Sequence, residues 1–111
     1  MFVAIYTTFE SLEEAKEFSH ILLEKKLAAC VNLIKDVHSV YRWKGKIEEA
    51  TEIILLCKTQ DFLIEKIHSL IDESHSYDLP AFVVYPIHTG SEKYLKWISE
   101  ETQLAKPQQK P

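Results

Sequence analysis

The sequence predicts a single domain of the α+β class. At 111 residues the chain has the length of one domain, and its low content of Gly and Pro argues against a linker or a disordered chain. Short apolar runs rich in β-forming residues alternate with segments whose apolar residues recur at helical spacing. A Lys44-Gly45 pair separates two β-type runs, which is typical of a hairpin. The order is β-α-β-β-α-β plus a final helix, which fits the ferredoxin-like, split βαβ arrangement with both main helices on one sheet face.

The first half of the chain contains a strand, a helix and a long strand. The apolar run at 2–8 predicts the first strand. Ser11 with Glu14 three residues later has the form of a capping box, so we expect a helix over 12–26. Residues 27–43 return to β character, and the polar pair Lys35-Asp36 within them indicates a bulge.

The second half begins at the hairpin turn and contains a strand, a helix, a strand and a helix. A strand is expected over 47–59, and Asp61 is the expected cap of a helix that ends near Ser74. The run 81–87 predicts a last strand, in which Pro86 marks an edge, an end or a bulge. Ser91 is the expected cap of the last helix. We expect the domain to span 1–104 and the polar tail 105–111 to be disordered.

Three of the predicted strands are apolar at successive positions, which indicates that both of their faces are covered. These strands contain Phe2, the run 53–57 and Phe82. A two-layer fold leaves one sheet face open, and the rest of this short chain is too small to cover it. We therefore expect identical copies to pack their sheets together in a symmetric homo-oligomer.

Composition excludes several classes of partner. The net charge of -4 offers no broad cationic surface, so no nucleic acid partner is expected. The chain begins without a basic segment and has no apolar run of roughly 18 residues, so we expect neither export nor a membrane span and place the protein in the cytoplasm. Cys30 and Cys57 lie in apolar runs and are expected to stay free thiols.

Five histidines invite a search for a metal site, yet none belongs to a dense ligand motif. His20 and His68 fit solvated helix positions, and His38 and His88 have no supporting neighbours. His75 opens a loop that contains an aromatic residue and a proline, and functional side chains concentrate in such loops. His75 is therefore the candidate metal ligand, and the alternative that it has no binding role stays open.

A second set of candidates combines charged and aromatic side chains. Glu52 and Lys58 are six residues apart on one strand, so they point to the same face. Tyr77 and Trp97 carry large apolar areas with one polar group each, which suits both interfaces and ligand clefts. Catalysis is not expected, because neither cysteine has a guaranteed base nearby. The glycine-rich phosphate loop of an acylphosphatase is also missing from the sequence.

Five motifs in order resemble the CutA divalent-cation tolerance family, over roughly residues 2–98. They are Leu27-Ala28-Ala29-Cys30-Val31-Asn32, Tyr41-x-Trp43-x-Gly45-Lys46, Glu52 to Lys58-Thr59, His75-x-Tyr77-x-x-Pro80 and Gly90-x-x-x-Tyr94-Leu95-x-Trp97. The resemblance implies a ferredoxin-like subunit, a homotrimer related in architecture to PII signalling proteins, and a role in metal tolerance, notably of copper. It also implies a cleft between subunits lined by Glu52, Lys58, His75, Tyr77 and Trp97.

The copper-binding pattern of enterobacterial members of that family is only partly present. Tyr6 stands where the pattern has a cysteine, and Ser74 replaces one of two adjacent histidines, so only His75 remains of the three ligands. One imidazole does not select copper by itself. The resemblance therefore implies a non-enzymatic trimer that binds a divalent cation, with copper as the first candidate, or a small ligand, without an organic cofactor. The alternative is a PII-like scaffold that binds protein partners and has no specific metal site.

Overall fold

The computed structural model of the chain describes residues 1–102 and has the predicted order of elements. The predicted tail at 105–111 and the end of the predicted domain lie outside the described residues. The elements are β1 (Phe2–Phe9), α1 (Leu12–Glu24), β2 (Cys30–Trp43), β3 (Lys46–Gln60), the short 3-10 helix η1 (Asp61–Leu63), α2 (Ile64–Ser74), β4 (Val83–Pro86) and α3 (Glu92–Glu101).

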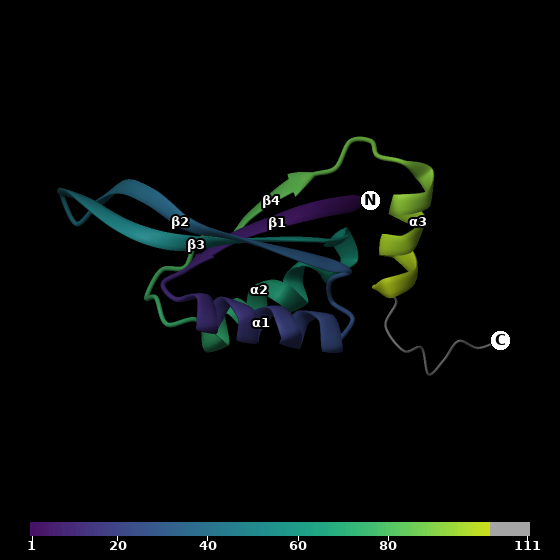
Figure 1. Cartoon of the computed structure of the whole chain (residues 1–111), viewed down its shortest axis with the longest axis horizontal. Coiled ribbons are helices and arrows are strands. Elements are labelled where there is room, and N and C mark those ends of the chain that lie inside the picture. The colour runs from purple at the N-terminus through teal and green to yellow at the C-terminus, as the bar shows by residue number, and fades with distance from the viewer. Residues whose placement is uncertain (103–111) are drawn as a thin grey trace.

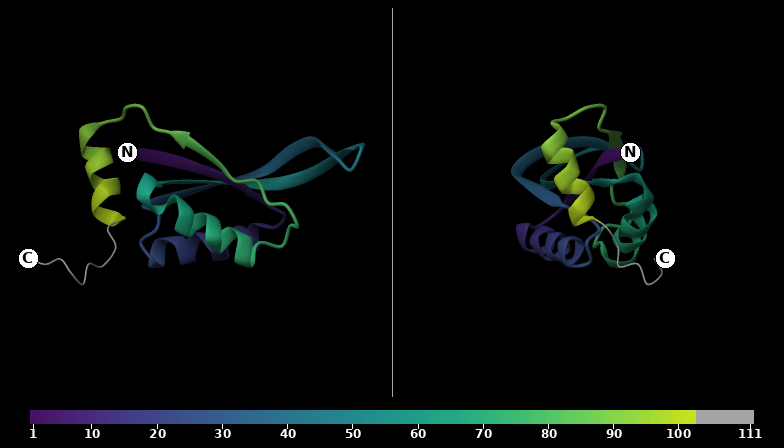
Figure 2. Two further views of the ribbon diagram at one scale, coloured as in Figure 1. Left: turned by 180° about the vertical axis from the view of Figure 1, so that it is seen from behind. Right: turned by 90° about the vertical axis from the view of Figure 1, so that its right-hand side faces the viewer.

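The four strands form one antiparallel sheet in the order β2-β3-β1-β4. Helices α1 and α2 lie side by side against one face of this sheet, and α3 lies beyond one end of it (Figures 1 and 2). This topology is the split βαβ arrangement, so the predicted α+β, ferredoxin-like fold class is confirmed.

The β2–β3 hairpin extends far beyond the helices, at the opposite end of the molecule from α3 (Figures 1 and 2). Trp43 pairs with Lys46, and the two residues between them, Lys44 and Gly45, have φ angles of 51° and 80°. Positive φ at both central residues defines the tight turn whose twist matches that of the strands. The predicted bulge is confirmed as well, because the register shifts between Ile34 and Val37.

Two of the three predicted helix caps are confirmed. Ser11 Oγ accepts a hydrogen bond from the backbone N–H of Glu14, and Ser91 Oγ accepts one from that of Tyr94, each at 3.1 Å. The prediction for Asp61 was wrong, because this residue begins η1 and its carboxylate lies 3.4 Å from the terminal amine of Met1.

Three predicted boundaries are also corrected. Helix α1 ends at Glu24 and not at 26, because Lys26 takes a left-handed conformation with φ of 59°. Strand β2 begins at Cys30, after residues 27–29 have crossed from the helix layer to the sheet. Strand β4 covers only Val83–Pro86, and its place at the sheet edge explains how Pro86 is tolerated.

The two faces of the sheet differ in coverage. Alternate residues of β3 face the helices and are almost inaccessible, with Leu55 at 1% and Cys57 at 0% exposure. The residues between them, such as Ile54 and Leu56, lie on the helix-free face and are only partly buried. That face is also apolar at its margins, where Tyr85 is 51% exposed. The apolar second face that the sequence predicts is therefore present in the fold.

Candidate functional site

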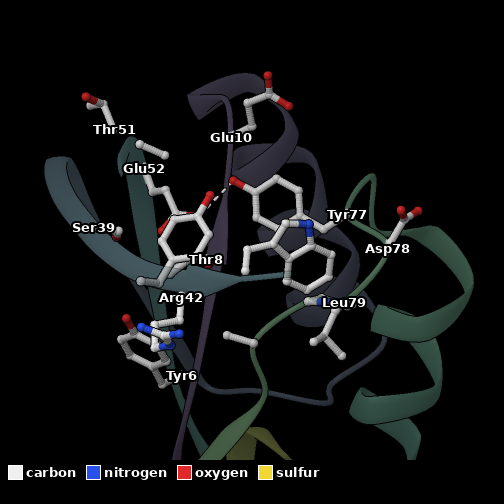
Figure 3. A pocket seen from close by; sticks show the side chains of 15 residues that line it. Tyr6, Thr8, Glu10, Ser39, Arg42, Thr51, Glu52, Tyr77, Asp78 and Leu79 are labelled. Carbon is white, nitrogen blue, oxygen red and sulfur yellow. Dashed lines mark hydrogen bonds between the residues drawn. The ribbon is translucent and has the colours of Figure 1, made fainter. Parts of the chain in front are cut away.

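Glu52 and Tyr77 are joined where the hairpin leaves the body of the sheet. Glu52 lies on the helix-free face of β3, opposite Val37 and directly after the bulge in β2. The Tyr77 hydroxyl donates a hydrogen bond to Glu52 Oε2 at 2.8 Å (Figure 3). Burial and this bond raise the pKa of Tyr77. Glu52 is only 9% exposed, so the phenol supplies a partner to a carboxylate that is largely withdrawn from water.

His75 lies beside this pair, and both of its ring nitrogens are engaged. Nδ1 accepts a hydrogen bond from the backbone N–H of Tyr77 at 3.0 Å, and Nε2 lies 2.6 Å from the carbonyl oxygen of Thr8. Because an N–H faces Nδ1 and a carbonyl faces Nε2, these partners fit the neutral ring protonated on Nε2. The ring also stacks on Phe9 at 4.4 Å between centroids. A metal ion on either nitrogen would have to displace one of these two hydrogen bonds.

The loop that follows His75 is fastened to helix α1. The backbone N–H and the hydroxyl of Ser76 donate to the two carboxylate oxygens of Glu14, at 3.1 and 3.0 Å. These two bonds and the contacts of His75 hold the two residues that precede Tyr77. The orientation of the phenol toward Glu52 is therefore set by contacts with β1, α1 and β3.

A pocket of about 780 Å³ opens between this loop, the base of the hairpin and β1 (Figure 3). Aromatic rings of Tyr6, Tyr41, Trp43 and Tyr77 contribute to its wall. Burial, followed by the charge of Glu52, raises the pKa of Tyr6. The remaining lining residues are Thr8, Glu10, Ser39, Arg42, Ala50, Thr51, Glu52, Asp78, Leu79, Pro80 and Ala81. The pocket therefore combines apolar walls with both signs of charge.

A second cluster surrounds Lys58 near the C-terminal end of β3. The Lys58 ammonium donates to Asn32 Oδ1 at 3.1 Å and to the Tyr94 hydroxyl oxygen at 3.2 Å, and Cys30 Sγ lies 4.0 Å away. The Tyr94 and Trp97 rings of α3 are 5.5 Å apart. Strands β2 and β3 and helix α3 thus converge on one lysine side chain.

The five residues of the predicted cleft form two groups within one subunit. Glu52, His75 and Tyr77 lie together, whereas Lys58 and Trp97 belong to the second cluster. The six-residue step from Glu52 to Lys58 along the strand spans roughly 20 Å. One small ligand therefore cannot touch both groups of the same subunit.

Sequence reasoning missed Asn32 as the partner of Lys58 and the Thr8 carbonyl as the partner of His75. The contact between Asn32 and Lys58 could have been anticipated in part, because the alternation of side chains along β2 places Cys30 and Asn32 on the same face. The contact between His75 and Thr8 could not have been predicted from the sequence, since every residue has a backbone carbonyl.

The other histidines and the cysteines add no metal cluster. His38 lies 3.9 Å from Glu49 and His68 lies 3.6 Å from Asp72, and all four side chains are at least half exposed. Within residues 1–102, three or more potential metal-ligating side chains of His, Cys, Asp or Glu do not gather at any point. Both cysteines are free thiols, as predicted.

Comparison with known proteins identifies one family. Residues 3–101 match the model of the CutA1 divalent ion tolerance protein family. The divalent-cation tolerance protein CutA of Archaeoglobus fulgidus is 43% identical over 96 residues, which are 86% of this chain and 93% of that protein. A CutA homolog of Danio rerio is 43% identical over 88 residues, which are 79% of this chain and 59% of that protein.

Solved structures agree with this match. An Archaeoglobus fulgidus structure, described as a periplasmic divalent cation tolerance protein CutA, superposes with a TM-score of 0.90 at 41% identity and covers 93% of this chain and all of that one. A divalent cation tolerance protein from Thermus thermophilus also superposes with a TM-score of 0.90, at 36% identity and with the same coverage.

Two further observations concern the length of the chain relative to its relatives and the search for membrane-spanning helices. It spans between 55% and 64% of the length of the vertebrate and plant relatives it matches. In the part of the chain that the structure describes, none of the helices has the length and apolarity required to cross a membrane.

Proposed function

Because the chain belongs to the CutA1 divalent ion tolerance family, we propose that it acts as a non-enzymatic homotrimer that binds a divalent cation or a small ligand at clefts between subunits. The observation that carries this proposal is the helix-free sheet face, where apolar side chains such as Ile54 and Leu56 are only partly buried in the single subunit. Apolar surface is stabilised by burial against another protein surface. A second and a third copy supply that surface under closed symmetry.

The division of the predicted cleft residues supports a site between subunits. The Glu52, His75 and Tyr77 group lies near the projecting hairpin, and the Lys58 and Trp97 group lies near α3. Glu52 and Lys58, one from each group, are six residues apart along β3. In the proposed trimer, one group from each of two copies lines a shared cleft, and each copy contributes to two clefts.

Copper is the first candidate cation for these clefts, with His75 as its proposed ligand. Copper binds imidazole well, but a single histidine gives little selectivity. Binding at Nδ1 would cost the bond from the Tyr77 N–H, so metal binding and the position of Tyr77 would be coupled. The family name supports a role in the tolerance of divalent ions and specifies neither copper nor this residue.

Copper titration of the purified protein tests the metal half of the proposal. The expected result is saturable binding that weakens by about tenfold or more in His75→Ala. His20→Ala is the matched control, because His20 is an exposed helix residue, and this variant should bind like the parent. Equal binding by both variants and the parent would refute a role for His75.

The second candidate function is a PII-like scaffold in which the outer surface of the trimer binds a protein partner. The long exposed hairpin favours it, since side chains such as Val40 and Ile47 are more than 60% exposed in the single subunit. Under this alternative, Glu52→Gln and Lys58→Met would leave metal tolerance unchanged, whereas hairpin substitutions would abolish it.

We also propose that the protein works in the cytoplasm, which the two free thiols support. The Archaeoglobus relative is described as periplasmic, so the proposal needs a direct test. Cell fractionation should recover the protein with cytoplasmic markers, and recovery with periplasmic markers would refute this location.

A further inference from the structure

The second cluster has an unusual arrangement of charge and hydrogen-bond donors. Lys58 is partly buried, and the groups around its ammonium, on Asn32, Tyr94 and Cys30, are polar groups without formal charge. Among residues 1–102, no carboxylate lies within ion-pair distance of Lys58. The charge of Lys58 therefore has no counterion among the described residues, and an anion from outside the subunit would supply one.

The neighbours of Lys58 also leave donors unused. The side-chain carbonyl of Asn32 accepts from Lys58, so its amide NH₂ points its two hydrogens elsewhere. The Tyr94 oxygen accepts from Lys58, and within the described residues its own hydroxyl hydrogen has no acceptor. The third ammonium hydrogen faces only Cys30 Sγ at 4.0 Å, which is a weak contact. The Lys58 cation therefore lies among neutral neighbours, and the Tyr94 hydroxyl hydrogen and the Asn32 amide hydrogens beside it are left without partners among the described residues.

From this arrangement we propose that the Lys58, Asn32 and Tyr94 cluster binds an oxyanion, namely a carboxylate or phosphate group of a small ligand. An oxyanion offers only acceptors and carries the opposite charge, which matches the donors of the cluster. A bare divalent cation does not suit this place, because the ammonium of Lys58 repels it. The inference rests on the cleft between subunits proposed above. It assigns the anion to the Lys58 group of that cleft and any metal ion to the His75 group.

Trp97 provides a reporter for this site. Its ring lies 5.5 Å from that of Tyr94, and Trp43 is the second of the two tryptophans in the sequence. In a Trp43→Phe background, Trp97 becomes the single tryptophan, so its emission reports events around Tyr94. The metal-free protein in its natural oligomeric state is titrated with inorganic phosphate and, separately, with acetate, at constant ionic strength with chloride as the reference.

The expected result is a saturable change in Trp97 emission with phosphate or acetate beyond that caused by chloride. A response to acetate as well as phosphate would assign the site to oxyanions in general, and a response to phosphate alone would assign it to phosphate groups. Lys58→Met should weaken binding by about tenfold or more, because a charge-assisted bond is lost. Tyr94→Phe retains the ring and loses only the hydroxyl, so it should weaken binding by about threefold to tenfold.

Lys66→Met is the matched control, because Lys66 is an exposed lysine on α2, and it should bind phosphate like the parent. The proposal would be overturned if neither anion acted beyond chloride, or if Lys58→Met and Tyr94→Phe both bound like Lys66→Met. Since the titration uses metal-free protein, its result is independent of copper binding at His75. If the protein bound the anion but no copper, only the proposed binding of a metal ion would be refuted.

Discussion

The two faces of the sheet carry similar side chains but have different surroundings. On β3, Leu55 faces the helices and is 1% exposed, whereas its neighbour Leu56 points to the helix-free face and is only partly buried. Cys57 and Cys30 show the same contrast, since the first is fully buried and the second is partly accessible. The comparison teaches that the apolar side chains of one face are buried within the subunit, whereas those of the other face stay partly accessible and are available for assembly.

The largest expected effect comes from placing a charge on the helix-free face. Leu56→Asp would bury a carboxylate in the proposed trimer, and each such ion costs several kcal/mol, so the molar mass in solution should fall below that of a trimer. Phe62→Asp is the matched control, because Phe62 is 58% exposed outside that face, and this variant should keep the parental mass. An unchanged mass for Leu56→Asp would contradict assembly through this face.

Truncation on the covered face should act on the subunit itself. Leu55→Ala leaves a cavity in the core and should lower the free energy of unfolding by about 2–5 kcal/mol. Denaturant unfolding monitored by circular dichroism measures this change. A decrease in the free energy of unfolding of less than about 1 kcal/mol for Leu55→Ala would contradict its burial in the core, since surface substitutions have effects of that size.

The sequence predicted the sheet because its signals are local. The Lys44-Gly45 turn, the Lys35-Asp36 bulge and the Ser11 and Ser91 caps each depend on residues a few positions apart. Asp61 failed as a cap because its carboxylate lies beside the amine of Met1, a contact between distant parts of the chain.

The site was predicted less completely, for the same reason. The motif resemblance implied Lys58 and Tyr77, but their partners depend on how strands and helices meet. Asn32 reaches Lys58 across the β2–β3 ladder, and Thr8 meets His75 only once β1 and the loop after α2 are in place. Residue type alone therefore identifies the charged and aromatic groups, and the fold identifies what each of them contacts.

A polar contact on the helix-free face allows a smaller test of the comparison. Tyr77→Phe removes the hydroxyl that donates to Glu52 and should lower the free energy of unfolding by about 1–3 kcal/mol, because a largely buried carboxylate loses a partner. Glu52→Gln keeps an acceptor oxygen and should cost less. A double-mutant cycle with both substitutions measures their coupling, and additive effects would show that the two side chains are independent.

The smallest expected effect concerns pH and the buried thiol. Burial raises the pKa of Cys57 from its ordinary value of 9.0 to about 12. Between these values the folded state retains a proton that the unfolded state has lost. This contribution to stability is therefore complete below pH 9 and disappears as the pH rises toward 12.

Denaturant unfolding at pH 8 and at pH 10.5 measures this pH dependence. Cys57→Ala should lose less stability between the two pH values than the parent, whereas Cys30→Ala retains Cys57 and should lose as much as the parent. Equal losses for Cys57→Ala and the parent would contradict the assignment to this thiol.

The molar mass of the full chain in dilute solution tests the central claim most directly. Sedimentation equilibrium on protein purified without chelators should give three times the subunit mass of 12.9 kDa, and the same sample can be analysed for bound metal. A folded protein with the mass of one subunit would contradict the account, because the apolar face would then be stable in water and the cleft between subunits would not exist.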